Sequence, residues 1–197
     1  MLNEQQAARF EEVRNVKLEA GAHSYGRIDA GACAMEMAAY VAGEKWSDHP
    51  QCVDLALGAA CRAANDHGPQ WVRDAIRDRI PQLIGTRGDS ALLIKRADVF
   101  TWGAIREIAP YYLKRAGLIE HAKTLREFAS SWSKAREVCQ TAQSAAEAAT
   151  AYAAIAAYAV AAVYSASAAY AAAADASQTP AWQMFIEALD RAIAVTY

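Results

Sequence analysis

The sequence predicts an all-α protein, a helical bundle with a long Ala/Tyr-rich C-terminal helix. Two observations support this prediction. Apolar residues recur at the spacing of amphipathic helices through most of the chain. Capping residues, glycines and prolines fall between these periodic segments, where helices begin and end. The 197 residues suit one domain, 1–197, in which 1–122 precedes the long Ala-rich helix and a terminal amphipathic helix within 123–197.

The first predicted elements are separated by clear breaks. Asn3 is a suitable N-cap for a short first helix. The glycine-bearing segment 16–31 predicts a loop, with a short strand at 16–18. A second helix is expected over 30–42, because Gly43 suits the left-handed position that follows a helix end.

The next elements lie between further turn signals. Ser47 or Asp48 is expected to cap a third helix, which ends at the turn-forming segment 65–68. The segment 70–84 is amphipathic and predicts a helix that Pro81 bends or ends. Its predicted inner side consists of Trp71, Ala75, Ile76, Ile80 and Leu83.

The remaining chain predicts further helices. Asp89 or Ser90 is expected to cap one that runs to about residue 108, and a short helix from Pro110 is closed by Gly117. No helix breaker follows until 178–180, so one or two long helices are expected before a last amphipathic one. The predicted inward residues are Leu92, Leu93, Phe100 and Ile105, and then Trp182, Phe185, Ile186, Leu189 and Ile193.

The span 148–174 contains no charged residue and has a tyrosine at every sixth position from Tyr152 to Tyr170. A step of six residues turns a helix by roughly 240°, so these tyrosines do not share one face. A helix that is apolar on all sides is buried, lies in an oligomer interface or spans a membrane. The acidic flanks Glu147 and Asp175 argue against a membrane span. Burial within the monomer and self-association remain as alternatives.

Composition and charge disfavour several classes of protein. The formal net charge is −2, so no basic field favours nucleic acid or an anionic membrane. The polar, acidic start of the chain resembles neither a secretory signal nor a transit peptide. The four cysteines lie in apolar or helical contexts without a CxxC pair, which is typical of reduced thiols. We therefore expect a cytoplasmic protein.

Glu36 is the main candidate for a functional side chain, because it lies in the otherwise apolar segment 32–42. A carboxylate in such a segment is partly buried and requires hydrogen-bond donors. It could act as a general base or a metal ligand. The preferred interpretation is structural: Glu36 accepts hydrogen bonds from Trp46 or from backbone amides of the following turn, and so fixes a pair of helices.

The turn that follows this segment concentrates further polar residues. Glu44, Asp48 and His49 could ligate a divalent cation, and Cys52 could add a sulfur ligand for zinc. His49 and Cys52 could also act as base and nucleophile. No cofactor is expected, and a divalent metal is the alternative. The complete candidate cluster consists of Glu36, Glu44, Trp46, Asp48, His49, Cys52, Asn65 and Asp66.

The middle of the chain is basic, and a weak phosphate-binding patch there is a further alternative. Aspartates alternate with the first of these cations, as on a solvated helix face. No Walker loop, GxGxxG, HExxH, GxSxG or EF-hand motif occurs. The basic residues are Arg73, Arg77, Arg79, Arg87, Lys95, Arg96, Arg106, Lys114 and Arg115.

The chain resembles a known family through the ordered segments GAHSYG, MEMAAYVAGEKWSDHPQC, AAND, IPQLIGTRGD and YYLKRAGLIEHA within 21–122. They are similar to a family of uncharacterised helical proteins from actinobacterial genomes and tailed phages, with a VAGExWSDHP signature and an Ala-rich C-terminal region. The resemblance implies a phage or mobile-element setting and a cytoplasmic protein, with no established activity. Ala64 stands where the family has tryptophan. The matching positions are His23, Cys33, Glu36, Gly43, Glu44, Trp46, Ser47, Asp48, His49, Pro50, Cys52, Asn65 and Asp66.

From these observations we expect a non-enzymatic phage or mobile-element accessory protein that acts through helix surfaces on itself or on a host protein. Neither a membrane nor a specific nucleic acid is expected as a partner. The first alternative is a metal-dependent enzyme or metal-binding protein that uses Glu36, Glu44, Asp48 and His49. The second alternative is a weak nucleic-acid binder.

Overall fold

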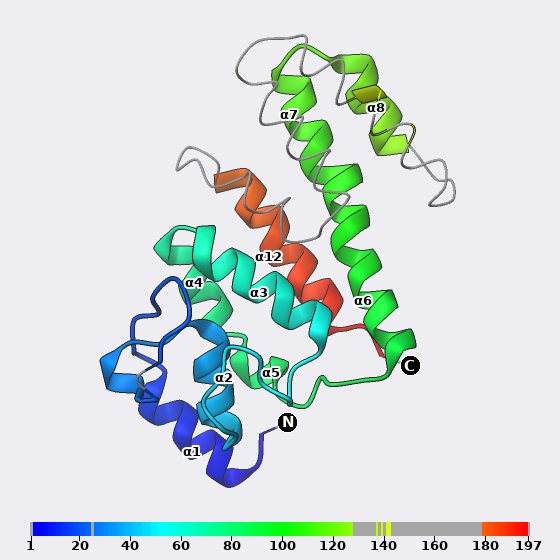
Figure 1. Cartoon of the computed structure of the whole chain (residues 1–197). Coiled ribbons are helices and arrows are strands. Elements are labelled where there is room, and N and C mark those ends of the chain that lie inside the picture. Colours follow the sequence, from blue (N-terminus) through cyan, green and yellow to red (C-terminus); the bar gives the residue numbers. More distant parts are fainter. Residues whose placement is uncertain are drawn as a thin grey trace. The chain divides into compact units, whose positions relative to one another are not determined.

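The computed structural model describes residues 2–24, 26–127, 137, 139, 141–142 and 179–196. The regular secondary structure of these residues is helical, which confirms the all-α class and fits a helical bundle (Figure 1). The predicted Ala/Tyr helix over 148–174 lies outside the described residues. Within the described part of the chain, no helix is long and apolar enough to cross a membrane.

The chain divides into two compact units, which are described separately. The first unit comprises Met1–Ala97 together with Leu189–Tyr197, and the second comprises Asp98–Ala188. The sequence instead predicts one domain whose parts meet at residue 122. The division into units falls within two helices, where neither glycine nor proline marks a boundary.

The first unit is built around α2 (Ala34–Ala42). This helix packs against α1 (Glu4–Val13), α3 (Leu55–His67), α4 (Gln70–Arg77) and α5 (Ile80–Leu83). Nearly all of its side chains are buried. Several of them are alanines, whose small side chains let neighbouring backbones approach closely from several directions.

Several helix ends follow their sequence signals. Asn3 caps α1: its Oδ1 accepts the Gln6 amide at 2.9 Å, and the Gln6 side chain accepts the Asn3 amide at 3.1 Å. Gly43 follows α2 with φ of 78°, as predicted. Asp89 precedes α6 (Ser90–Gly103), and its Oδ1 accepts a first-turn amide at 2.9 Å. These caps confirm the predicted starts or ends of three helices.

The start of α3 differs from the prediction. Asp54 is the N-cap, and its Oδ1 accepts the Ala56 amide at 2.9 Å. The predicted caps, Ser47 and Asp48, lie in a non-helical connection. Asp54 is also paired with Arg96 at 3.2 Å. A tertiary contact therefore favours this cap, and that contact has no signature in the local sequence.

The predicted helix over 70–84 is two short helices, α4 and α5, which are interrupted at Asp78 and Arg79 before Pro81. Trp71 was predicted to face inward and is 37% exposed, so that prediction is wrong. Val72 is buried in its place. At the start of α4, the buried face of the helix therefore includes Val72 and not Trp71.

The second unit begins within α6 and continues through a π-helical turn, Ala104–Ile108, into α7 (Ala109–Arg115). Proline at position 110 has no amide hydrogen to donate, and the wider turn before it accommodates its ring. After Gly117, α8 (Ile119–Glu127) packs beside α7 (Figure 1).

The last helix of the chain, α12 (Thr179–Ile193), contributes to both units. Its predicted inward residues Trp182, Phe185 and Leu189 are buried, whereas Ile186 and Ile193 are only half-buried. In the second unit, the ring of Phe185 stacks on Phe100 with the ring centroids 6.1 Å apart. This helix therefore confirms the amphipathic segment predicted after residue 178.

Candidate functional site

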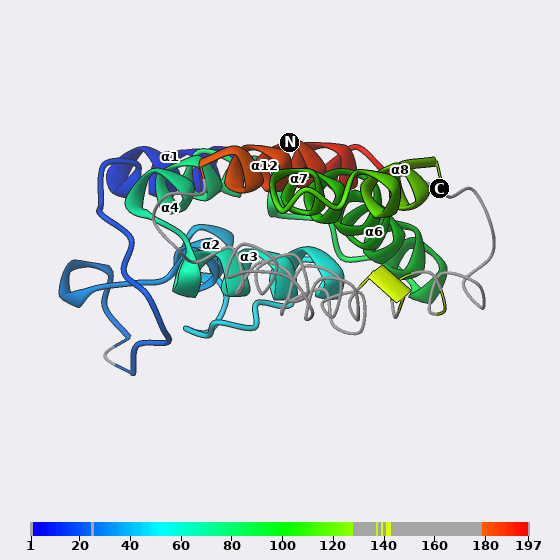
Figure 2. The same ribbon diagram turned by 90° about the horizontal axis from the view of Figure 1, so that it is seen from above.

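The N-terminal loop, defined as residues 14–24 and 26–33, connects α1 to α2, and its middle part extends away from the helices of the first unit (Figure 2). Its regular structure is one 3₁₀ turn, Ile28–Ala30, and the short strand predicted at 16–18 does not form. Glu19 donates its amide to the carbonyl of Ala32 at 3.0 Å, which closes the base of the loop. Leu18 is buried beside this contact, so its apolar side chain serves as a core anchor.

Glu36 holds the N-terminal loop from inside α2. The residue is 1% exposed, and its Oε2 accepts the Cys33 amide at 2.8 Å. The same oxygen lies 2.9 Å from Nδ1 of His23, and Oε1 accepts the His23 amide. These donors offset the cost of burying the carboxylate. The geometry therefore agrees with the structural interpretation of Glu36.

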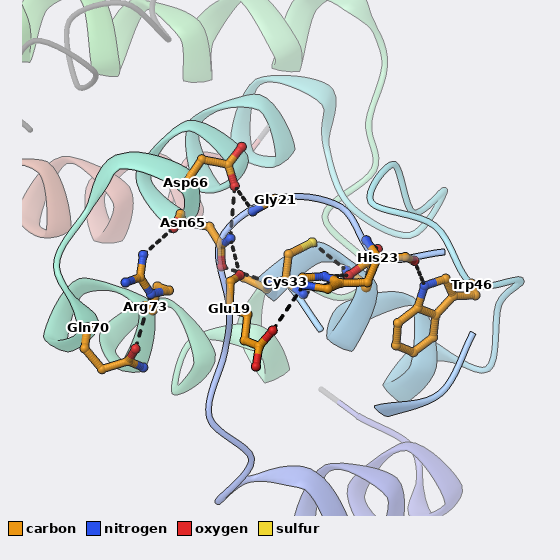
Figure 3. Close-up of polar contacts among 11 residues, drawn as sticks. Glu19, Gly21, His23, Cys33, Trp46, Asn65, Asp66, Gln70 and Arg73 are labelled. Carbon is orange, nitrogen blue, oxygen red and sulfur yellow. Dashed lines mark hydrogen bonds and ion pairs between the residues drawn. The ribbon is translucent and has the colours of Figure 1, made fainter. Parts of the chain in front are cut away.

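The predicted partners of Glu36 were nevertheless wrong. The Trp46 indole donates to the carbonyl of His23 at 2.7 Å and not to Glu36 (Figure 3). Glu36 occupies the third position of α2 and forms a capping box with Cys33, so it reaches back to the residues before its own helix. The sequence feature that indicates this capping box is the three-residue spacing of Cys33 and Glu36. It is easily overlooked, because cysteine is not among the usual capping residues.

A second anchor for the N-terminal loop comes from the end of α3. Asn65 is fully buried; its Oδ1 accepts the Ala34 amide at 3.1 Å, and its Nδ2 donates to the Glu19 carbonyl at 2.8 Å. Asp66 is exposed and accepts the Gly21 amide at 2.8 Å (Figure 3). The predicted candidates Asn65 and Asp66 therefore bind the same loop as Glu36.

The other predicted candidates make local contacts in the connection between α2 and α3. Oε2 of Glu44 accepts the Gln51 amide at 2.6 Å, and Asp48 lies 2.8 Å from Nδ1 of His49. Burial, together with the carboxylate of Glu44, raises the pKa of the Cys52 thiol to about 12. A nucleophilic cysteine needs a lowered pKa, so this environment argues against Cys52 as a nucleophile.

Metal ligation has little geometric support among the residues described. They contain no group of three or more His, Cys, Asp and Glu side chains placed where it could hold a metal ion. The predicted ligand set of Glu44, Asp48, His49 and Cys52 is therefore not assembled as a metal centre in this part of the chain.

The first unit contains a buried ion pair that has no signature in the local sequence. Arg96 pairs with Asp54 at 3.2 Å, and it also donates to the carbonyls of Thr86 and Val195. Both members of the pair are buried. The sequence places Arg96 among the basic residues of a possible phosphate-binding patch, because nothing in its local pattern distinguishes it from an exposed cation, but its side chain is buried in this ion pair.

Several other arginines of the basic region are engaged in the first unit. Arg73 donates to the carbonyls of Asn65 and Gly68 at 2.7 and 2.8 Å, near the end of α3. Arg79 forms a bidentate ion pair with Asp190. These side chains support helix ends and helix contacts, so they do not present a row of free charges for phosphate.

No protein-family model, curated protein or solved structure matches this chain. The argument for function therefore depends on the geometry of the described residues. The candidates Glu36, Trp46, Asn65 and Asp66 hold one loop, and the atoms they use are turned toward backbone groups and His23. These hydrogen bonds can hold the N-terminal loop in a defined conformation.

Proposed function

We propose that this chain is a non-enzymatic accessory protein of a phage or mobile element, and that it acts by binding another protein. The observation that supports the binding role is the N-terminal loop, whose base is held by buried side chains and whose tip is exposed. We define the loop tip as residue 24 and residues 26–30. Loops positioned by a rigid scaffold are frequent sites of recognition.

The anchors of the N-terminal loop favour binding because they reduce its conformational freedom before a partner arrives. Glu36 and Asn65 hold the two sides of its base through backbone groups, and Trp46 holds the carbonyl of His23. A loop that is already ordered loses less entropy on association than a mobile one. This anchoring therefore leaves more of the contact energy available for affinity.

The chemistry of the loop tip fits a polar protein surface better than a phosphate group. Arg27 and Asp29 are 70% and 65% exposed in their side chains, and they form an ion pair. Arg27 holds the pKa of the Asp29 carboxyl below its usual range. The positive charge is thus balanced locally, and both side chains can still offer directed hydrogen bonds to a partner.

The phage or mobile-element setting is supported by a different observation, the VAGEKWSDHP segment and the ordered segments around it. In this setting the partner is a host protein or a second copy of the chain. The N-terminal loop replaces helix surfaces as the proposed contact, because the loop tip is the exposed region that the candidate residues jointly position.

The proposal is tested by photo-crosslinking in the cells that encode the protein. A photoreactive amino acid is placed at Arg27 in the loop tip, and at Glu4 in α1 as the matched exposed control. We expect one protein to be captured from position 27 and not from position 4. We also expect Asp29→Arg to weaken its binding to the purified chain about tenfold, because one partner-facing charge is reversed.

Equal capture from both positions, or unchanged binding by Asp29→Arg, would contradict the proposal. Elemental analysis of untagged protein purified without chelator tests the metal alternative directly. A stoichiometric metal that is lost in His49→Ala would replace this proposal with a metal-binding function.

A further inference from the structure

The backbone of His23 is held from two different elements. Its amide donates to Oε1 of Glu36 on α2, and its carbonyl accepts the indole N–H of Trp46 at 2.7 Å (Figure 3). Trp46 belongs to the α2–α3 connection, defined as residues 43–54. Because His23 lies directly before the loop tip, the position of the tip depends in part on this connection.

The α2–α3 connection has braces of its own on either side of Trp46. Oε2 of Glu44 accepts the Gln51 amide at 2.6 Å, which closes the connection on itself. The Asp48 carbonyl accepts Nη1 of Arg62 at 3.0 Å, which fixes the connection to α3. The half-buried indole of Trp46 is therefore presented to the N-terminal loop from a braced segment.

We propose that the N-terminal loop and the α2–α3 connection open and close as one cooperative unit, with the hydrogen bond of Trp46 as the link between them. Proteins open locally in such contiguous units. When the connection opens, the His23 carbonyl loses its indole donor; when the loop opens, the indole loses its acceptor. Each opening therefore makes the other easier.

This coupling gives the loop tip a second surface from which its order is set. His49 and Gln51 are exposed residues of the α2–α3 connection. Coupling between two sites is reciprocal, so a molecule that orders the connection also orders the loop, and a partner on the loop tip protects the connection. This regulatory use rests on the proposed function, whereas the cooperative opening requires no partner.

Native-state hydrogen exchange of the wild-type full chain, read by NMR at increasing low concentrations of urea, tests the cooperative unit. Its reporters are the His23 amide in the loop, and the Trp46 indole N–H and the Gln51 amide in the connection. We expect these protons to share one opening free energy and one dependence on urea, both smaller than those of the amides within α3.

Two outcomes of this measurement would overturn the proposal, and neither depends on the folding of a variant. The first is a His23 amide that exchanges through a different opening from the Trp46 indole and the Gln51 amide. The second is exchange of all these protons only in the opening that also exposes α3, because the loop and the connection then form no unit of their own.

Two substitutions test the link itself. Trp46→Phe keeps an aromatic ring and removes the indole donor, so exchange of the His23 amide should rise about threefold to tenfold, the level of one neutral hydrogen bond. Arg62→Met removes the donor to the Asp48 carbonyl. Alone, it should raise exchange of the Gln51 and His23 amides together; combined with Trp46→Phe, it should further raise that of Gln51 only.

The matched control is Arg126→Met, at an exposed arginine on α8 of the second unit, which should change neither amide. An unchanged His23 amide in Trp46→Phe or in Arg62→Met, or the same increase on adding Arg62→Met in both backgrounds, would show that the two segments open independently. Such results would leave the proposed binding role intact, since that role fails only if the loop tip captures no partner.

Discussion

Single residues in the first unit act mainly by holding backbone groups that lie far away in the sequence. Glu36 and Asn65 are fully or nearly fully buried polar side chains, and each contacts the N-terminal loop. A buried polar group is costly when it loses its partner, more so than an exposed one. The strongest tests of single residues therefore replace one buried polar side chain, and compare the loss of unfolding free energy with that of the same substitution at an exposed residue.

Replacement of Glu36 should destabilise the fold. In Glu36→Gln, Oε2 is exchanged for an amide that cannot accept from the Cys33 amide or from His23. We expect the free energy of unfolding in urea to fall by about 2–4 kcal/mol. The matched control is Glu11→Gln, an exposed carboxylate paired with Arg14, for which the expected loss is below about 1 kcal/mol. Equal effects of the two variants would contradict a structural role for Glu36.

The buried thiols predict a loss of stability at alkaline pH. Burial raises the pKa of Cys61 from 9.0 to about 12, so the unfolded chain loses this proton at lower pH than the folded chain. Between these values the unfolded state binds fewer protons, and the free energy of unfolding falls as the pH rises. Urea unfolding at about pH 8 and about pH 10 should show this decrease, by up to about 1.4 kcal/mol per pH unit for each such thiol.

Cys61→Ala isolates the contribution of this thiol. Its stability at about pH 8 is lower because a buried side chain is truncated, but the further loss on going to about pH 10 should be smaller than in the wild-type chain. The same pH dependence in both chains would show that Cys61 does not remain protonated in the folded state.

At the scale of the helices and loops, local signals and tertiary contacts contributed differently to what could be predicted. Asn3, Gly43 and Asp89 act within one turn of chain, so their roles follow from the sequence alone. The cap of α3 depends on Arg96, which is distant in sequence, and it was therefore assigned to the wrong residues. Helix caps formed within one turn of chain could be predicted from the sequence, whereas contacts between residues of different helices could not.

The candidate site shows the same difference between local features, which the sequence indicates, and tertiary contacts, which it does not. The burial of Glu36 followed from its apolar neighbours, and the importance of Asn65 and Asp66 followed from a family resemblance. That all of them meet the N-terminal loop depends on how α2 and α3 pack, which no local spacing specifies. His23 matches the family signature, but its neighbours in the sequence do not indicate that its ring lies near the carboxylates of Glu19 and Glu36.

Alanine substitutions at two glycines should change the free energy of unfolding in opposite directions. Gly43 has a φ of 78°, and a Cβ there would also meet the guanidinium of Arg9, so Gly43→Ala should lower the unfolding free energy by about 1 kcal/mol. Gly58 lies within α3, and the nearest atom to its added Cβ would be on Arg62 at 3.4 Å. Gly58→Ala should raise stability by about 0.5–1 kcal/mol through helix propensity.

Thermal unfolding followed by circular dichroism checks this pair of substitutions. A higher melting temperature for Gly43→Ala would contradict the left-handed C-cap of α2. A lower one for Gly58→Ala would show that α3 and α2 pack too tightly at this point for even one added methyl group.

At the scale of the whole molecule, the first unit is completed by residues from the far end of the chain. Leu189 and Ala192 are buried in it, Asp190 pairs with Arg79, and the Val195 carbonyl accepts from Arg96. The N-terminal loop and its anchors therefore belong to a unit that needs both ends of the chain. The sequence does not indicate this pairing, because it joins segments separated by the entire second unit.

Removal of residues 189–197 should destabilise the first unit. The truncated chain loses two buried side chains and leaves Arg96 with one fewer acceptor, so we expect a loss of about 3 kcal/mol or more. Asp190→Asn, which weakens only an ion pair with an exposed aspartate, should cost less than about 1 kcal/mol. Urea unfolding distinguishes the two. Equal stability of the truncated and full chains would show that Leu189–Tyr197 is dispensable for the first unit.

The central claim is that the polar residues of the first unit hold the N-terminal loop ready for a protein partner. The most direct test is the affinity of the crosslinked partner for Asp66→Ala, measured by calorimetry. Asp66 holds the Gly21 amide at 2.8 Å and lies outside the loop tip, so this variant loosens the loop and leaves the proposed contact residues in place. We predict a dissociation constant about fivefold to tenfold higher, because the partner must then order the loop. An unchanged affinity, with hydrogen exchange showing a loosened loop, would contradict the claim.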